Sequence, residues 1–263
     1  MEGNAANTQA GAHADLPGVK LWFIDTGGAG APVMLLHPNT GTCETWESQI
    51  AGLSQARYRV IAFDRRGWGK SFADEKPGAK SASVAEDLDA LVGYLKLARF
   101  HLLGVAGGGF IAMDYAAWRP ERVGASTGMI QDKEIADFIA RIAIPGIREQ
   151  SPHYREIGPS YRGANPDGVK RWIEIDEHAR QPGAGFQPSL RAPNTLAKIR
   201  SISTPALVIA ADADLLAPPG LMRIWAAHLR NHEWAVIHDA GHAMTWEQPG
   251  RFNDIVLDFL RRH

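Results

Sequence analysis

The sequence predicts an α/β fold, in which helices flank a mostly parallel central sheet and a helical cap is inserted. Short apolar runs rich in β-formers alternate with segments whose apolar residues recur at helical spacing, which is typical of βαβ units. Glycine or proline turns separate many of these segments. The alternation stops between residues 131 and 198 and then returns, which indicates one core domain with an insertion.

Strands are predicted throughout the first half of the chain. Residues 33–36 are wholly apolar, which is typical of a central strand covered on both faces. The turn at Gly27-Gly28 closes the strand before it. In chain order, the strands are expected over residues 19–25, 33–36, 59–63, 100–105 and 123–129.

Helices are predicted between these strands. Ser83 and Glu86 have the spacing of a capping box, in which two side chains bond the free N–H groups at a helix start. Apolar residues then recur at helical spacing as far as Leu95. The helices are expected over residues 46–53, 83–97 and 110–118.

Residues 131–198 are predicted to form a helical cap over the active edge of the sheet. Prolines divide this segment into short helical pieces, and it carries several aromatic residues. A disordered linker is the alternative, but disordered segments are poor in aromatics. The core domain would comprise residues 19–130 and 199–263, with residues 1–18 as a flexible tail. Beyond the cap we expect strands over 206–210 and 233–238, and helices over 219–229 and 249–261.

Composition argues against several classes of protein. The 263 residues are 45% hydrophobic and 22% charged, and the net charge is −1, so neither a nucleic acid nor a membrane is expected as a partner. The single cysteine, Cys43, cannot form an intramolecular disulfide. With no long apolar run and no signal-peptide features, we expect a cytoplasmic protein. The oligomeric state stays open, with a homodimer as one candidate.

The run Gly104-Val105-Ala106-Gly107-Gly108 has the setting of a nucleophile elbow. It follows a predicted strand and precedes a predicted helix, as the motif G-x-S-x-G does. Ala106 stands where that motif has its serine, and a methyl group cannot attack a carbonyl. Either an active serine has been replaced, or the protein works without a covalent nucleophile. A phosphate-binding loop is the alternative, but the run does not match G-x-G-x-x-G.

An acid and a histidine follow later strands, in the order of a nucleophile–acid–histidine triad. Asp214 comes after the strand at 206–210, and His242 comes after the strand at 233–238. Parallel strands place such residues together at their carboxyl ends. Asp212 and Asp132 are alternative acids.

Three further motifs, together with this order, make the chain resemble the α/β-hydrolase superfamily over residues 19–261. The resemblance is to its serine esterase and lactonase branch, with alanine at the nucleophile position. The motifs are His37-Pro38-Asn39, the run D-R-R-G-W-G-K-S over residues 64–71, and Gly241-His242 followed by Glu247 and Pro249.

This resemblance implies roles for the site residues. His242 would act as general base and acid, and Asp214 would orient its ring. The backbone N–H of Gly107 would be one oxyanion donor. Pro38 has no N–H, so the second donor would be the N–H of Asn39, with Thr40 as the alternative. At Pro38 this sequence departs from the usual glycine of the family.

Substrate contacts are expected from Pro38, Tyr154, Tyr161, Trp172 and Met244. The histidines lack the spacing of metal ligands, so we expect neither a metal nor a cofactor. The likeness to small esterases and enol-lactonases implies a hydrolase of a small carboxylic ester or lactone that uses an acyl-enzyme. The chain itself would be a form inactivated at Ala106.

Other functions stay open at this point. The loop over residues 67–71 also resembles that of the meta-cleavage-product hydrolases, which break carbon–carbon bonds with the same triad. A pseudo-enzyme that binds a small ligand would need no serine. A cofactor-independent lyase or oxygenase would use only the histidine as a base.

Overall fold

The computed structural model describes residues 11–73, 83–124, 133–181 and 190–263. One sheet has the strand order β1-β2-β4-β3-β6, and a short strand β5 (Phe72–Ala73) also pairs with β2. A second, parallel sheet consists of β7 (Ala206–Ala211) and β8 (His232–Ile237). The strands of the first sheet are β1 (Ala12–Leu16), β2 (Val19–Asp25), β3 (Pro32–Leu36), β4 (Arg59–Phe63) and β6 (His101–Gly104).

The centre of the first sheet is parallel, as predicted. Strand β3 pairs with β4 on one side and with β6 on the other, so that Met34 lies opposite both Ile61 and Leu102. The edge formed by β1 and β2 is antiparallel. The α/β-hydrolase fold expected from the sequence is therefore present, with an antiparallel edge on the parallel sheet.

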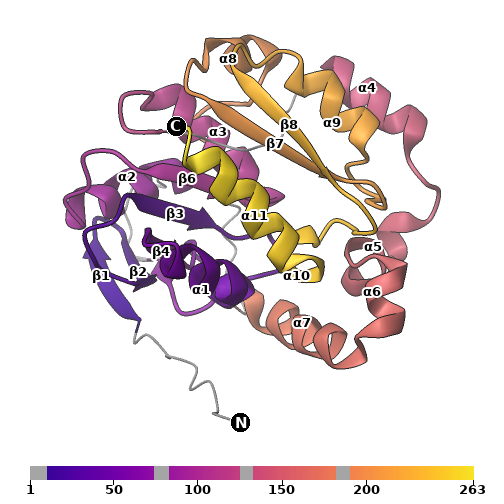
Figure 1. Ribbon diagram of the computed structural model, residues 1–263, viewed down its shortest axis with the longest axis horizontal. Helices are drawn as coiled ribbons and strands as arrows, with labels where there is room; N and C mark the ends of the chain where they lie inside the picture. The colour runs from indigo at the N-terminus through magenta and orange to yellow at the C-terminus, as the bar shows by residue number, and fades with distance from the viewer. Residues whose placement is uncertain (1–10, 74–82, 125–132, 182–189) are drawn as a thin grey trace.

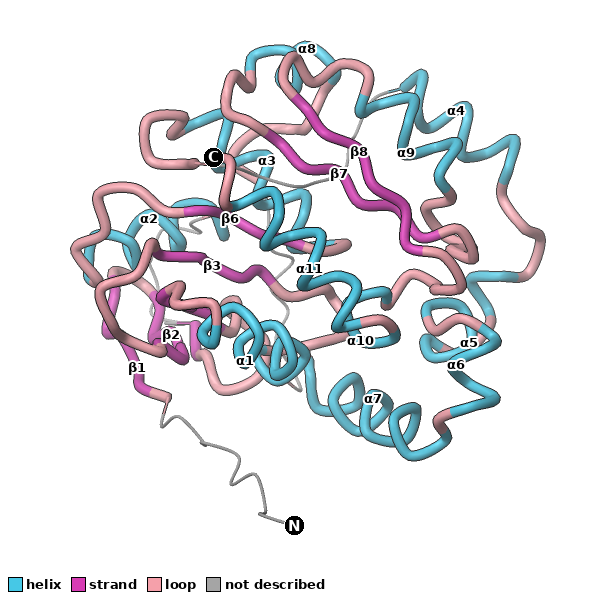
Figure 2. The backbone as a smooth tube through the Cα atoms, in the orientation of Figure 1, coloured by secondary structure: helices cyan, strands magenta, loops and turns pink. Residues whose placement is uncertain are grey.

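Helices cover both faces of the sheets (Figures 1 and 2). Alternate residues of β3 enter separate cores: Val33 and Leu35 pack with α1 and α11, while Met34 and Leu36 pack with α2 and α3. The core helices are α1 (Glu47–Gln55), α2 (Val84–Tyr94), α3 (Gly107–Trp118), α8 (Leu196–Ser201), α9 (Pro219–Ala226), α10 (Met244–Glu247) and α11 (Pro249–Leu260), and a 3-10 turn η1 (Cys43–Trp46) precedes α1.

The capping box at the start of α2 is confirmed. The Ser83 side chain accepts the N–H of Glu86, and the Glu86 carboxylate accepts the N–H of Ser83 at 2.7 Å. Local sequence chemistry was enough to locate this helix start, because both partners lie within one turn.

The structure differs from the sequence prediction near residues 12–16, and it describes only part of the strand predicted over residues 123–129. Residues 12–16, assigned to the flexible tail, instead form β1, which makes a hairpin with β2 through the turn at Gly18. The prediction was wrong there because β1 consists mainly of small and polar residues, a weak strand signal. Val123 pairs in parallel with Phe100, but residues 125–129 of the strand predicted there lie outside the described residues.

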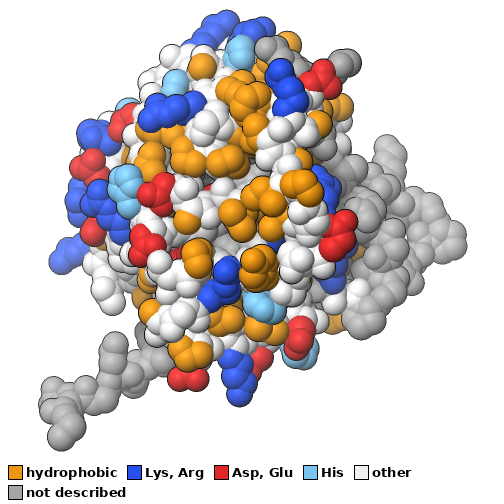
Figure 3. All heavy atoms as spheres, turned by 90° about the vertical axis from the view of Figure 1, so that its right-hand side faces the viewer, with side chains coloured by type: hydrophobic (Ala, Val, Ile, Leu, Met, Phe, Trp, Pro, Cys, Tyr) orange, Lys and Arg blue, Asp and Glu red, His pale blue; other side chains and the backbone are white. Residues whose placement is uncertain are grey.

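The cap is helical where it is described. Its elements are α4 (Lys133–Ile142), η2 (Ile147–Glu149), α5 (Pro152–Glu156), α6 (Pro159–Ala164) and α7 (Pro166–Ala179). Proline opens each of α5, α6 and α7, where its missing N–H costs nothing. Hydrophobic side chains gather in the middle of the face beside α4, α5 and α6, with charged side chains around them (Figure 3).

Candidate active site

The turn between β6 and α3 has the backbone of a nucleophile elbow. Ala106 has φ +45° and ψ −118°, a conformation that residues with a β-carbon rarely adopt. The turn is tight enough that a Cβ atom on Gly104 would lie 2.5 Å from the carbonyl oxygen of Gly108. The chain therefore places the Ala106 methyl group at the position from which a serine of this motif would act.

His242 and Asp214 form a hydrogen-bonded dyad. The ring nitrogen Nδ1 of His242 lies 2.7 Å from Oδ2 of Asp214. The other carboxylate oxygen of Asp214 accepts the backbone N–H groups of Leu216 at 2.8 Å and Ala217 at 2.9 Å. Asp214 is buried and therefore held in one orientation, with one oxygen left for the imidazole. Nε2 of His242 remains for proton transfer.

The surroundings shift both pKa values so that the pair is ionic. Burial alone would lower the pKa of His242, but the charge and hydrogen bond of Asp214, with the charges of Glu156 and Glu247, raise it to about 9. Burial would raise the pKa of the Asp214 carboxyl, but the His242 charge and the hydrogen bonds hold it below its usual value. Asp214 thus stabilises the imidazolium that proton transfer would create.

The loop after β3 lies against the elbow. A Cβ atom on Gly107 would lie 2.3 Å from Oδ1 of Asn39, so the Asn39 side chain takes the space that a side chain at residue 107 would need. In the described part of the chain, the backbone N–H groups of Gly107 and Asn39 have no protein acceptor. Gly107 is half-buried and Asn39 is exposed, so both N–H groups are accessible to a ligand oxygen.

Of the two alternative acids, Asp212 is not the partner of His242. Asp212 instead bonds His238, whose Nδ1 lies 2.8 Å from Oδ2 of Asp212, and the His238 side chain is 82% exposed. Asp132 lies outside the described residues.

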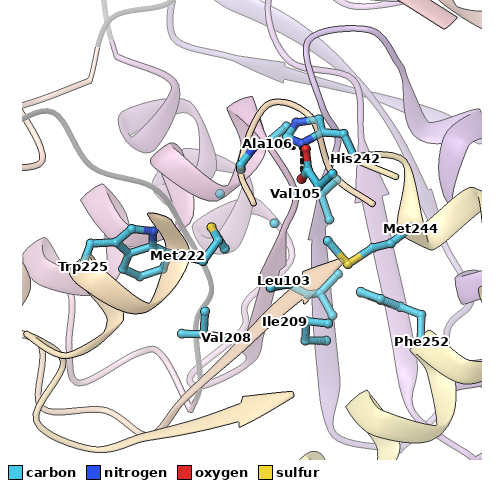
Figure 4. Close-up of a pocket in the computed structure, with 15 residues that line it drawn as sticks. Leu103, Val105, Ala106, Val208, Ile209, Met222, Trp225, His242, Met244 and Phe252 are labelled. Atoms are coloured by element: carbon cyan, nitrogen blue, oxygen red, sulfur yellow. Dashed lines mark hydrogen bonds and ion pairs between the residues drawn. The ribbon is translucent and has the colours of Figure 1, made fainter. Parts of the chain in front are cut away.

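Ala106, Asp214 and His242 line one end of a mainly apolar cavity (Figure 4). Met244, which was expected to contact substrate, is also part of its wall. The other apolar walls come from β6, β7, α9 and α11, through Leu103, Val208, Ile209, Met222, Trp225 and Phe252. The cavity therefore offers an apolar environment, with its polar groups concentrated at the dyad.

The aromatic residues of the cap are placed differently from the prediction. Tyr154 is 46% exposed and lies under the guanidinium of Arg162, so it faces solvent. Trp172 is buried in the packing of α7, and the Tyr161 hydroxyl accepts from Asn165 within the cap. Among the described residues that line the cavity, none of these three is present. Sequence alone could not separate packing aromatics from those that face a ligand.

Two glutamates connect the cap to the loops around the site through hydrogen bonds. Glu156 of α5 accepts the Thr40 hydroxyl at 2.8 Å, and its backbone oxygen accepts the N–H of Ala243. Glu247 accepts the N–H of Gly241 at 3.0 Å and that of Gly158 in the cap at 2.9 Å. These contacts join the loop of Thr40, the loop of His242 and the cap. Glu247 belongs to a recognised motif, but its partner in the cap is set by tertiary structure.

The described residues contain no group of three or more histidine, cysteine or acidic side chains arranged to hold a metal ion. Across the same residues, no helix has the length and apolar character needed to cross a membrane.

The fold, the elbow and the His–Asp dyad define an α/β hydrolase. The profile of the alpha/beta hydrolase family matches residues 33–255, and the chain belongs to this family. The 2-hydroxy-6-oxononadienedioate/2-hydroxy-6-oxononatrienedioate hydrolase of Paraburkholderia phymatum is 28% identical over 271 residues, which cover 92% of this chain and 91% of that protein.

Solved structures agree with this assignment. A thermophilic esterase from Thermogutta terrifontis superposes with a TM-score of 0.79 at 25% identity, covering 95% of this chain and 98% of the esterase. The enol-lactonase of Burkholderia xenovorans LB400 has a TM-score of 0.76 at 24% identity, covering 95% of this chain and 100% of the enol-lactonase, and this likeness concerns the fold.

Proposed function

We propose that the site takes a small carboxylic ester or lactone, with its carbonyl carbon beside residue 106. One observation carries the proposal: the elbow residue Ala106 lines one cavity with His242 and Asp214, which form a hydrogen-bonded dyad. The Asn39 side chain lies against Gly107, the next residue of the elbow, so the backbone N–H groups of Gly107 and Asn39 are the candidate oxyanion donors that acyl transfer would need beside this dyad. The esterase and enol-lactonase likenesses support this substrate class.

Ala106 limits what the chain can do. Acyl transfer needs a hydroxyl whose oxygen attacks the carbonyl carbon while a base takes its proton. The Ala106 methyl group has neither the lone pair nor the proton, so no acyl-enzyme forms at this position. The chain, as an inactivated form of such a hydrolase, would bind the ester or lactone and leave its acyl bond intact.

Restoring a hydroxyl tests this proposal. We expect Ala106→Ser to raise the rate of aryl-ester or lactone hydrolysis by at least about 10³-fold over the Ala106 chain, because the serine completes an otherwise assembled triad. The rate is measured with p-nitrophenyl esters and with a panel of lactones. The double variant Ala106→Ser/His242→Ala is the control, and it should return to the Ala106 rate. A well-folded Ala106→Ser variant with background rates on both panels would contradict the proposal.

Carbon–carbon bond hydrolysis is the second candidate, favoured by the similarity to the Paraburkholderia phymatum hydrolase over most of both chains. The same dyad and oxyanion donors would serve this reaction. A vinylogous 1,5-diketone distinguishes the candidates. Faster turnover of the diketone than of esters by the Ala106→Ser variant would favour this second function.

A further inference from the structure

Arg65 is a buried cation beside the loop after β3. It is 1% exposed, and its Nη2 donates to the carbonyl oxygen of Pro38 and to Oδ1 of Asn39, both at 3.0 Å. Its guanidinium lies 4.4 Å from the centre of the Trp68 ring. The neighbouring carboxylate of Asp64 already accepts the backbone N–H groups of Cys43 and Lys70, at 2.7 and 2.9 Å.

His37 supports the same arrangement. Its Nε2 accepts the backbone N–H of Arg65 at 3.0 Å, so the ring proton lies on Nδ1, which donates to the carbonyl oxygen of Pro38 at 2.7 Å. Burial and the charge of Arg65 hold the pKa of His37 well below its usual value, which keeps the ring neutral. The Pro38 carbonyl thus receives two hydrogen bonds from the same side.

The direction of the Asn39 N–H follows from peptide geometry. The C=O of Pro38 and the N–H of Asn39 belong to one trans peptide and point in opposite directions. Because Arg65 and His37 hold that carbonyl on their side, the Asn39 N–H points away from Arg65. The Trp68 indole N–H holds the next carbonyl, that of Asn39, at 2.9 Å. These contacts leave the loop little freedom to flip its peptides.

We propose that Arg65 is the positioning residue of the oxyanion hole, turning the Asn39 N–H and the Asn39 side chain toward Gly107. This inference rests on the proposed function, because it assumes that a ligand oxygen sits between these N–H groups. Position 38 has a proline where the family usually has a glycine. In this chain, the hydrogen bonds from Arg65 fix the conformation of the loop. Arg65 acts through Asn39 and does not itself touch the substrate.

The test uses a probe that does not depend on the identity of the substrate. In the Ala106→Ser background, an alkyl fluorophosphonate reacts when the introduced hydroxyl attacks phosphorus, fluoride leaves and His242 takes the hydroxyl proton. The developing charge on the phosphoryl oxygen needs the same N–H donors. We expect Arg65→Lys to slow this labelling by roughly 10- to 100-fold, since misplaced donors cost rates of this size.

Arg180 provides the matched control. Its guanidinium lies 4.9 Å from the same Trp68 ring, but Arg180 is exposed and, among the described residues, donates no hydrogen bond to the Pro38-Asn39 loop. Arg180→Lys should therefore leave the labelling rate within about 2-fold. Equal losses from Arg65→Lys and Arg180→Lys would overturn the proposal.

A double-mutant cycle separates positioning from general stability. Asn39 is exposed, so Asn39→Pro should fold, and it should slow labelling by itself because proline has no backbone N–H. If Arg65 acts through the N–H of residue 39, Arg65→Lys should cost little more once Asn39→Pro is present. Fully additive losses would contradict the proposal. If Arg65→Lys does not fold, Asn39→Pro alone decides, and an unchanged labelling rate in that variant would overturn the proposal.

The outcomes distinguish the two proposals. Normal labelling of Ala106→Ser with no turnover of esters or lactones would contradict the proposed substrate class, while the Arg65 variants would still decide the positioning role. Turnover and labelling that are both unaffected by Arg65→Lys would overturn the positioning role alone. A folded Ala106→Ser variant that is not labelled at all would overturn both.

Discussion

At the scale of single residues, the elbow stores backbone strain at Ala106. Its φ of +45° with ψ −118° costs about 1–3 kcal/mol for a residue with a β-carbon. In an acyl-transfer enzyme, this conformation raises the nucleophile above the sheet edge. In this chain residue 106 has the strained backbone but no hydroxyl group. A substitution that removes the backbone strain would therefore not remove a nucleophile.

Ala106→Gly should therefore stabilise the protein. Glycine adopts a positive φ without strain, although it gives the unfolded chain more freedom at a cost of about 0.5–1 kcal/mol. We expect a net rise of about 1 kcal/mol in the free energy of unfolding, measured by urea denaturation. The control is Ala117→Gly in the same helix, which should destabilise by about 1 kcal/mol. A loss of stability at both positions would contradict the strain argument.

Some contacts of individual site residues could be predicted from the sequence, and others could not. The order of Ala106, Asp214 and His242 was readable because each follows a strand, and parallel strands end at one edge. The partners of Arg65 and Glu156 were not readable, because they depend on side-chain directions in loops that are far apart in the chain. Whether Tyr154 faces the cavity or the solvent depends on cap packing in the same way.

At the scale of elements, periodicity and capping predicted the helices and strands with strong local signals. The capping box of α2 and the apolar strand β3 are examples. Strand β1 was missed because its residues favour no local structure, and pairing with β2 decides its conformation. The connection between the cap and the core was equally hidden, since one of its hydrogen bonds joins Glu247 to the backbone N–H of Gly158, 89 residues away in the sequence.

Removing the charge at Glu247 should loosen this connection. Glu247→Gln replaces one of the two carboxylate oxygens, each 3.0 Å from the Gly241 nitrogen, by an NH2 group that cannot accept a hydrogen bond. We expect the free energy of unfolding in urea to fall by about 1–3 kcal/mol, because the NH2 group places a second donor against a buried N–H. Glu44→Gln is the matched control: Glu44 also bonds the cap, through Arg171, but this pair is exposed and should matter little. Similar losses from both variants would contradict the argument.

At the scale of the whole molecule, the fold class followed from the alternation of strand and helix signals along the sequence. The alternation of strands and helices is a property of the complete chain and survives errors at individual boundaries. The electrostatic state of the site does not follow from composition. A net charge of −1 says nothing of the charges that surround His242, which meet only after folding.

Those charges link global stability to pH. The folded-state pKa of His242 is raised to about 9, above its usual value of 6.5, so the folded state holds the proton more tightly. The stabilisation is complete below about pH 6.5 and is lost as the pH rises to about 9, a change of about 3 kcal/mol. We expect the stability advantage of the native chain over His242→Gln, measured by urea denaturation, to shrink by this amount between pH 6 and pH 10.

His238→Gln is the control, because the exposed His238–Asp212 pair is screened by solvent and should leave the pH profile nearly unchanged. Parallel profiles for the native chain and His242→Gln would show that the buried dyad is not held as an ion pair.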